Sequence, residues 1–328
     1  MAATSTTVGP AGIDWRPQAI LRRLRSGDEI AHIVTLIFGL SILAITAMLV
    51  YQLWIHSAPS RAKFGFNFFV TSVWDPVFDN FGALPFIYGT LITTAVALVL
   101  AVPLGLGAAI FLSELAPPKI SAGLSFVIDL LAAVPSVIYG LLAIFTLIPL
   151  LRVTIEPALK HYLGFIPLFR GPAYGIGFLA AGLVLAIMIV PYIVSVSREV
   201  LLAVPADQRE AALGLGCTRW ETTWKVVVPF ARTGIMGSIF LSMARALGET
   251  MAVTMVIGGT PQISSSLFAP GYSIAAVIAD QFTEATGTLY LSALVELGLV
   301  LFLITFILNG IARIMIIATQ KRGGGVAA

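Results

Sequence analysis

Long apolar runs constrain the fold of this chain more than any other feature of its sequence. A helix needs roughly 20 apolar residues to cross the hydrocarbon core of a bilayer. Six runs of this kind are bounded by charged or turn residues, at approximately 33–55, 86–112, 124–151, 174–196, 234–258 and 290–317. The alternating pattern of a β-barrel is absent, and a segment in lipid must satisfy its backbone hydrogen bonds internally. We therefore expect an all-α, polytopic membrane protein with six transmembrane helices.

The composition supports a membrane protein and argues against a nucleic-acid-binding protein. Of the 328 residues, 58% are hydrophobic and 11% are charged, and the mean hydropathy is +0.98. A soluble domain of this size cannot bury that much apolar surface. The sequence pI is about 9.1, but the cations separate apolar runs instead of forming a basic face. We expect contact with membrane lipid and none with nucleic acid.

The distribution of cations predicts the orientation, because short cytoplasmic loops retain Lys and Arg. One side of the expected membrane carries 13 of the 19 Lys and Arg residues, the other side carries 5, and Arg245 lies inside the fifth run. Both termini are therefore expected to be cytoplasmic. The expected organisation is a cytoplasmic arm (1–32), a first transmembrane helix (33–55), an extracytoplasmic loop (56–85), a five-helix core (86–318) with a cytoplasmic loop near 201–230, and a flexible cytoplasmic tail (319–328).

The cytoplasmic loop has the sequence signals of a helix, a glycine turn and a second helix. Pro205 suits a first turn, Glu210 favours the positive end of a helix, and Gly216 is placed to end it. Thr218 and Glu221 then have the spacing of a capping box, in which each side chain accepts a hydrogen bond from the other's backbone.

Apolar side chains accompany small ones in this loop. Ala211 and Ala212 leave a flat surface, and Leu213, Leu215 and Trp220 offer anchors for another protein. The alternative is that the apolar side chains pack on the membrane ends of neighbouring helices. The spacing alone does not decide between these two interpretations.

One motif in the loop resembles that of a known family. The run Glu210, Ala211, Ala212, then Gly216, then Val226, Val228 and Pro229 is similar to the EAA loop of ABC importer permeases, with every spacing matched. We refer to residues 205–229 as the EAA loop. The resemblance implies a type I permease core in a bacterial cell membrane, with a coupling helix that docks on a dimer of ATP-hydrolysing subunits. The chain has no G-x-x-x-x-G-K-[ST] motif, so we expect no enzyme and no bound cofactor, with ATP and Mg²⁺ used by the partner.

Two further stretches are similar to the phosphate branch of that family. They are residues 134–141 (VPSVIYGL) in the third run and 245–253 (RALGETMAV) in the fifth, and the whole resemblance covers approximately residues 85–318. The resemblance implies phosphate as the substrate and a second, related permease subunit. It also implies an extracytoplasmic phosphate-binding protein that docks on segments such as 259–289.

The fifth run contains a charge pair. Arg245 and Glu249 are four residues apart, so a continuous helix would place them on one face, where each would supply the partner that a charge in a membrane needs. The planar guanidinium of arginine matches the geometry of phosphate oxygens, so Arg245 is a candidate contact for phosphate. Glu249 is the candidate group that releases phosphate from Arg245, and Thr250 is a candidate residue beside the pathway. The alternative is a static ion pair that holds one helix against another.

The third run contains Pro135, which removes a backbone donor and leaves the Leu131 carbonyl in need of another partner. Ser136 is one candidate for that partner. Ser136 and Tyr139 are also candidates for a polar pathway lining, and a kink that serves only packing is the alternative.

Other classes of protein fit the sequence less well. A secondary transporter or channel also has several spans but does not need an EAA loop. A membrane metalloenzyme is disfavoured because His32, His56 and His161 fall in separate segments without the spacing of metal ligands. Within the ABC importers, a permease for sulfate or molybdate is the nearest competitor.

Overall fold

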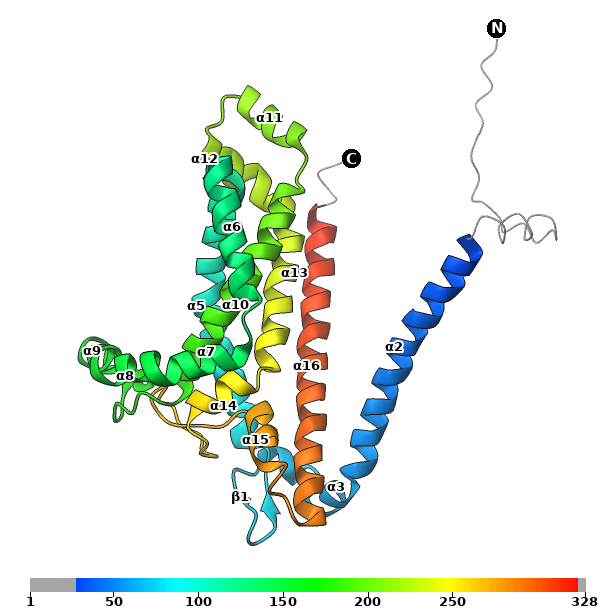
Figure 1. Ribbon diagram of the computed structural model, residues 1–328, viewed down its shortest axis with the longest axis vertical. Coiled ribbons are helices and arrows are strands. Elements are labelled where there is room, and N and C mark those ends of the chain that lie inside the picture. Colours follow the sequence, from blue (N-terminus) through cyan, green and yellow to red (C-terminus); the bar gives the residue numbers. More distant parts are fainter. Residues whose placement is uncertain (1–27, 324–328) are drawn as a thin grey trace, which may run out of the picture. The chain divides into compact units, whose positions relative to one another are not determined.

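The computed structural model describes residues 28–323, which Figure 1 colours along the chain. The chain divides into two units, residues 1–55 and 56–328. Helix α2 (Asp28–His56) accounts for the described part of the first unit. Most of the expected N-terminal arm and the last five residues of the expected tail lie outside the described residues.

In the described part of the second unit, the regular structure is helical apart from one two-stranded antiparallel sheet, in which Trp74 pairs with Phe81. Its elements, in chain order, are α3 (Ala58–Phe64), α4 (Asn67–Val70), β1 (Trp74–Asp75), β2 (Asn80–Phe81), α5 (Leu84–Ile110), η1 (Phe111–Leu115), α6 (Pro118–Ala132), α7 (Ser136–Leu142), η2 (Ala143–Leu147), α8 (Ile148–Leu150), η3 (Leu151–Ile155), α9 (Glu156–Leu163), η4 (Pro167–Phe169), α10 (Phe178–Leu202), α11 (Ala206–Gly214), α12 (Arg219–Thr222), η5 (Thr223–Val227), α13 (Val228–Leu247), α14 (Met251–Ile257), α15 (Ile274–Gln281) and α16 (Thr288–Gly323).

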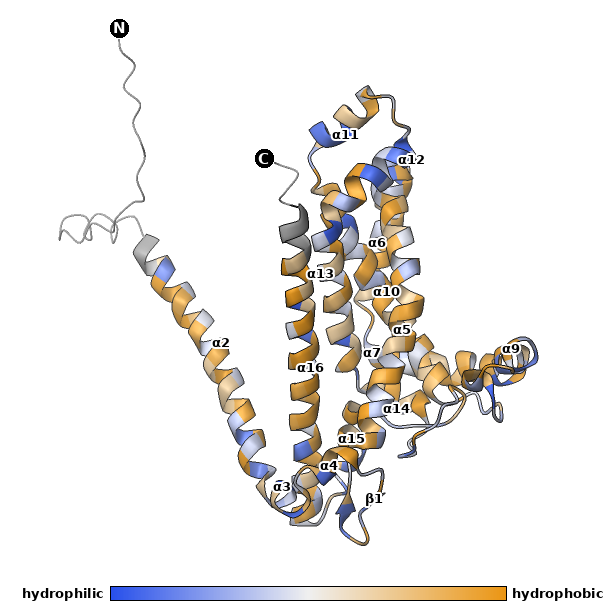
Figure 2. Ribbon diagram, turned by 180° about the vertical axis from the view of Figure 1, so that it is seen from behind, coloured by the Kyte–Doolittle hydropathy of each residue, from blue (hydrophilic) through white to orange (hydrophobic). Residues whose placement is uncertain are grey.

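Six helices of the described part are long and apolar enough to cross a membrane, which confirms the number predicted from the sequence. Figure 2 shows that the long helices are hydrophobic over most of their length, whereas hydrophilic residues gather at α12 and at one end of α11. The six candidate spans are Ala31–His56, Leu84–Leu115, Ser136–Leu163, Phe178–Leu202, Arg219–Leu247 and Thr288–Ala318.

The third apolar run does not form the single helix that we expected over 124–151. It is split between α6, which ends at Ala132, and α7, which begins at Ser136. Pro135 lies between them, and a proline both lacks an N–H and disfavours helical geometry in the residue before it. The run therefore contains a complete helix break instead of a kink.

The fifth apolar run is also interrupted, and the expectation of one helix over 234–258 is wrong. Helix α13 ends at Leu247 and α14 begins only at Met251. Gly248 is the residue that follows the last turn of α13. Gly248 has φ −91° and ψ −1°, a right-handed conformation that any residue adopts, so the break does not depend on a backbone geometry reserved for glycine.

Helices α5 and α10 pack together along the centre of the second unit, and glycines allow their close approach. A Cβ atom on Gly182 of α10 would lie 2.4 Å from Val96 of α5, and one on Gly105 of α5 would lie 2.7 Å from Ile193 of α10. Small residues suit membrane helix interfaces because close van der Waals contact replaces the hydrophobic driving force that lipid removes. Helices α6, α13 and α14 pack around α10, and α16 packs against α13.

Every π-helical turn of the described residues precedes a proline. The turns η1, η2, η3 and η5 are each followed, two residues after their last residue, by Pro117, Pro149, Pro157 and Pro229 in that order. The ring of a proline clashes with the carbonyl four residues before it, and here that carbonyl lies inside the π turn. The wider π turn separates the two groups, and η2, η3 and η5 continue into α8, α9 and α13 without a break, whereas after η1 the helix ends at Ala116.

Candidate functional site

The EAA loop has the helix, glycine turn and helix that the sequence predicts. Helix α11 carries Glu210, Ala211 and Ala212, and it is followed by Gly216 at φ +86°. That left-handed conformation favours glycine. The capping box is formed, because the Thr218 side chain accepts from the Glu221 N–H and the Glu221 carboxylate accepts from the Thr218 N–H at 3.0 Å.

The large apolar side chains expected as anchors in the EAA loop are exposed, whereas Ala212 and Val227 are buried. Leu213 is 45% exposed, Leu215 86% and Trp220 56%, so these side chains do not pack inside the bundle. Glu210 and Ala211 are exposed as well. Figure 1 places α11 at the far end of the helices from α14 and α15. The loop therefore presents exposed apolar side chains among hydrophilic ones at one end of the second unit.

Pro229, the last residue of the family motif, lies in the first turn of α13 and is exposed. The helix does not end there, because α12, η5 and α13 follow one another without interruption from Arg219 to Leu247. The helix that begins with the capping box thus continues into the fifth span.

The two stretches 134–141 and 245–253 both lie at helix breaks, and the breaks are close in space. Helix α7, which follows the first break, packs against α14, which follows the second. Gly140 makes the approach possible, since a Cβ atom there would lie 2.5 Å from the Met255 sulfur and 3.2 Å from the Ala252 Cα. The structure therefore brings the two sequence-predicted regions together, as α7 and α14 in Figure 1 show.

Tyr139 stabilises the first break. Its hydroxyl donates a hydrogen bond of 2.7 Å to the Leu131 carbonyl, which the sequence identified as a group in need of a partner. The Val134 N–H donates to the same carbonyl at 3.2 Å. Ser136, the other candidate for that role, is the first residue of α7. Tyr139 thus has a structural contact in addition to its proposed place beside the pathway.

Arg245 and Glu249 do not form the ion pair that we expected between them. Because α13 ends at Leu247, Glu249 lies outside the helix that carries Arg245, and the i,i+4 geometry is lost. The Glu249 carboxylate instead accepts from the Ala252 N–H at 3.4 Å, at the start of α14. Thr250, between these residues, donates its hydroxyl to the Gly248 carbonyl at 3.3 Å.

Arg245 has an aromatic neighbour that the sequence did not identify. Its guanidinium carbon lies 4.7 Å from the centre of the Tyr192 ring on α10, a cation–π geometry. Its Nε is buried without a hydrogen-bond partner. Tyr139 is also close enough to interact electrostatically with Arg245. In the sequence, Tyr192 follows Pro191 within an apolar run. Its hydroxyl group, among aliphatic residues, was the only signal that could have identified it.

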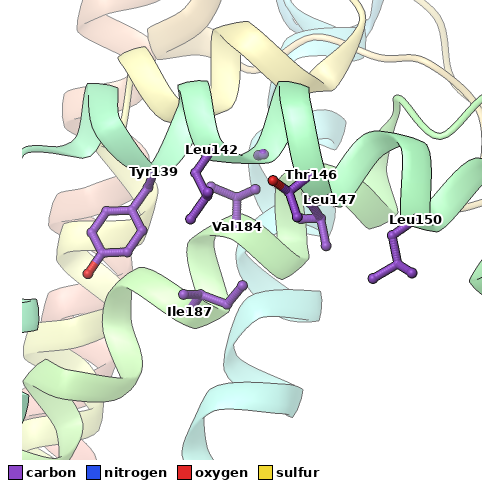
Figure 3. Close-up of a pocket in the computed structure, with 8 residues that line it drawn as sticks. Tyr139, Leu142, Thr146, Leu147, Leu150, Val184 and Ile187 are labelled. Carbon is purple, nitrogen blue, oxygen red and sulfur yellow. The ribbon is translucent and has the colours of Figure 1, made fainter.

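A pocket of about 160 Å³ lies beside α7 and α10, and Figure 3 shows Tyr139 near one end and Leu150 at the other. Apart from the hydroxyl groups of Tyr139 and Thr146, its lining is apolar. A phosphate anion requires charged or hydrogen-bonding partners when it leaves water. This pocket is therefore not the anion site.

A second pocket has the opposite character and is about 680 Å³ in volume. It is lined by Pro167, Arg170, Gly171, Pro172, Tyr174, Thr260, Gln262, Ser264, Ser265, Ser266, Ala269 and Pro270. We call it the serine-lined pocket. The Arg170 guanidinium is held by bonds of 2.9 Å to the carbonyls of Gly164 and Phe165. Its lining includes a cation and no carboxylate.

Comparison with known proteins identifies relatives over nearly the whole chain. Residues 101–316 match the family described as binding-protein-dependent transport system inner membrane component. The phosphate transport system permease protein PstC of Mesorhizobium japonicum is 46% identical over 310 residues, covering 93% of this chain and 95% of that protein. PstC of Pasteurella multocida is 47% identical over 294 residues, covering 88% and 92%.

Two solved structures of ABC transporters share the fold. A chain from a bacterial ABC transporter involved in the import of the acidic polysaccharide alginate aligns with a TM-score of 0.57 and 15% identity, covering 90% of this chain and 98% of that one. A chain of the inward-facing MetNI methionine ABC transporter aligns with a TM-score of 0.53 and 16% identity, covering 75% and 99%. With its six apolar helices, this chain is a multi-pass membrane protein that belongs to the family of binding-protein-dependent transport system inner membrane components.

Proposed function

We propose that this chain is the transmembrane permease subunit of an ATP-driven phosphate importer. The observation that carries the proposal is that the stretches 134–141 and 245–253 lie at two helix breaks that pack together through Gly140. Discontinuous helices are typical of transporter substrate sites, because irregular backbone at membrane depth is tolerated where protein or a water-filled cavity satisfies it. The similarity to PstC proteins over 93% of the chain supports phosphate over sulfate or molybdate.

The EAA loop is the proposed contact with the ATP-hydrolysing partner. Leu213, Leu215 and Trp220 present exposed apolar side chains, and the exposed Ala211 is small enough to let another backbone approach, whereas Ala212 is buried within the chain. In this proposal Glu210, Ala211, Ala212, Gly216 and Pro229 belong to the coupling element, which faces the cytoplasm. The partner dimer, and not this chain, uses ATP and Mg²⁺.

The proposed substrate pathway passes the two helix breaks, with Arg245 as the anion contact. Its Nε has no partner, and Tyr192 covers one face of the guanidinium without occupying its donors. The donors of an arginine match the oxygens of phosphate in a planar, bidentate arrangement. Ser136, Tyr139, Glu249 and Thr250 are the polar groups of the breaks that accompany it.

The remaining partners are a second, related permease subunit and an extracytoplasmic phosphate-binding protein. The serine-lined pocket is formed partly by the segment 259–289, the docking region expected for the binding protein. Arg170 is the single cation of its lining, and hydroxyl groups supply most of the remaining polar atoms. These groups suit the release of an anion towards the permease.

Uptake of radiolabelled phosphate into proteoliposomes that contain the chain and its partners tests this function. We expect uptake to require ATP and to be inhibited by unlabelled phosphate but not by equal concentrations of sulfate or molybdate. Equal inhibition by sulfate would assign the chain to another oxyanion. Uptake that proceeds without ATP would identify a secondary transporter.

Substituting glutamine for Glu249 separates a functional carboxylate from a structural one. Glutamine keeps an oxygen that can accept from the Ala252 N–H but removes the charge. We expect the thermal midpoint in detergent to be unchanged and phosphate import to fall, because in this proposal the Glu249 charge helps to release the anion from Arg245. Unchanged import in the folded variant would limit Glu249 to a structural role.

A further inference from the structure

One guanidinium connects the EAA loop to two membrane helices. Arg209 of α11 donates to both carboxylate oxygens of Glu114, at 2.9 and 3.2 Å. It also donates to the carbonyls of Leu201, at 2.8 Å, and Val204. Glu114 belongs to η1 at the end of α5, and Leu201 belongs to the last turn of α10. We call this set of contacts the Arg209 clamp.

The clamp adds a charged donor to carbonyls at a helix end, where the Leu201 carbonyl also accepts from the Val204 N–H at 3.3 Å. The last carbonyls of a helix have no N–H donor within the helix, and a cation near that end is favourable for the helix dipole. Arg209 supplies both effects to α10. Its planar fork binds the Glu114 carboxylate at the same time, a geometry that lysine cannot reproduce.

Burial distinguishes the clamp from an ordinary surface ion pair. The side chains of Arg209 and Glu114 are 23% and 10% exposed. In the nearby pair of Lys225 and Glu221 they are 68% and 41% exposed. An exposed pair contributes little because water and salt screen it, whereas a half-buried bidentate pair with further hydrogen bonds restricts its helices to one arrangement.

The helices that the clamp joins lead to the proposed pathway. Helices α5 and α10 pack together along their length, and α10 carries Tyr192 over the Arg245 guanidinium. A displacement of α11 therefore reaches the ends of α5 and α10 through Arg209. Along the chain, α11 is connected to α10 by the short link 203–205. It is connected to α12 by the turn at Gly216.

We propose that Arg209 is a positioning residue that transmits movement of the EAA loop to the α5–α10 pair through Glu114 and the end of α10. The proposal rests on the proposed function, since it assumes that a partner moves the EAA loop. Loss of the clamp is expected to uncouple the subunits. ATP hydrolysis continues in that case, but less phosphate is imported for each ATP.

The first test compares the ratio of phosphate imported to ATP hydrolysed in proteoliposomes. We expect Arg209→Gln and Glu114→Gln each to lower this ratio by about fivefold or more, the range of a modest coupling free energy. The ratio for Arg209→Lys should lie between the ratios of these two variants and that of the wild type. Lys119→Gln removes an exposed cation five residues from Glu114 and should leave the ratio unchanged. A wild-type ratio in both Arg209→Gln and Glu114→Gln would overturn the proposal.

The second test does not depend on transport. Cys217 is the only cysteine, so a spin label can be placed at position 215, which is 86% exposed, in a Cys217→Ser, Leu215→Cys background. We expect Arg209→Gln and Glu114→Gln to increase the mobility of this label in the isolated, folded chain. An unchanged spectrum would overturn the clamp whatever the substrate is. Absence of phosphate-stimulated hydrolysis in the wild type would instead reject the proposed function.

Discussion

Gly89→Ala is expected to leave little folded protein in the membrane. Gly89 is buried in α5, and a Cβ atom there would lie 1.9 Å from the Tyr272 carbonyl oxygen and 2.9 Å from its carbonyl carbon. These are backbone atoms, so no side-chain rotation relieves the clash. Overpacking a well-packed core costs about 1–3 kcal/mol and occasionally more, and we place this variant at about 3 kcal/mol or above.

Gly107→Ala is the matched control for this prediction. Gly107 lies in the same helix, is exposed, and has no atom within 4 Å of the position that a Cβ would occupy. Alanine in a helix interior is favoured over glycine by about 0.5–1 kcal/mol, so this variant should be as stable as the wild type or slightly more so. Thermal denaturation in detergent measures both. Equal midpoints for the two variants would contradict the packing of α5 against residues 271–273.

Arg245→Gln is expected to lower phosphate import by about 10- to 100-fold. A hydrogen bond to a charged group contributes about 1.5–3 kcal/mol, and each 1.4 kcal/mol corresponds to a factor of ten. Arg245→Lys keeps the charge but loses the planar fork, so import should be intermediate. The initial rate of phosphate uptake, measured at several concentrations of the phosphate-loaded binding protein, gives the effect of each variant.

Arg313→Gln is the control for the loss of charge, because Arg313 is an exposed arginine on α16. It should import phosphate at the wild-type rate. The thermal midpoints of the Arg245 variants should fall by no more than a few degrees, since the cation–π contact with Tyr192 accounts for about 1 kcal/mol. Wild-type import by Arg245→Gln would show that the arginine serves packing and not the substrate.

The EAA loop was predictable because its signals act over a few residues. The left-handed conformation of Gly216 and the capping box of Thr218 and Glu221 depend on local backbone geometry, and the structure contains both. The membrane spans were predictable for a similar reason, since the length of an apolar run reports directly on the thickness of the bilayer.

The helix breaks were less accessible, because hydropathy measures how apolar a segment is and not whether its helix is continuous. Residues 248–250 are Gly, Glu and Thr inside an apolar run, and because residues of these types also occur within continuous helices, they did not by themselves predict an interruption. Pro135 indicated a distortion but not a complete break. The wrong expectation of an Arg245–Glu249 pair follows directly from the assumption of a continuous helix.

Contacts between distant residues could not be predicted from the sequence at all. Tyr192 reaches Arg245 from another helix, and Arg209 and Glu114 are 95 residues apart. Both contacts depend on how α5, α10 and α13 pack, which is fixed by close approaches such as that of Gly182 to Val96. A single sequence contains the residues of these contacts but not their pairing.

The most direct test of the proposed function is phosphate-stimulated ATP hydrolysis in proteoliposomes that hold the chain with its partners, in the wild type and in Gly216→Trp. Position 216 has space for a side chain, but its φ of +86° does not suit one, so tryptophan should distort the turn at a local cost of about 1–2 kcal/mol. We predict hydrolysis that depends on phosphate in the wild type and loses that dependence in a folded, membrane-inserted Gly216→Trp protein. Hydrolysis that is indifferent to both phosphate and the substitution would contradict the assignment of the chain as the coupled permease of a phosphate importer.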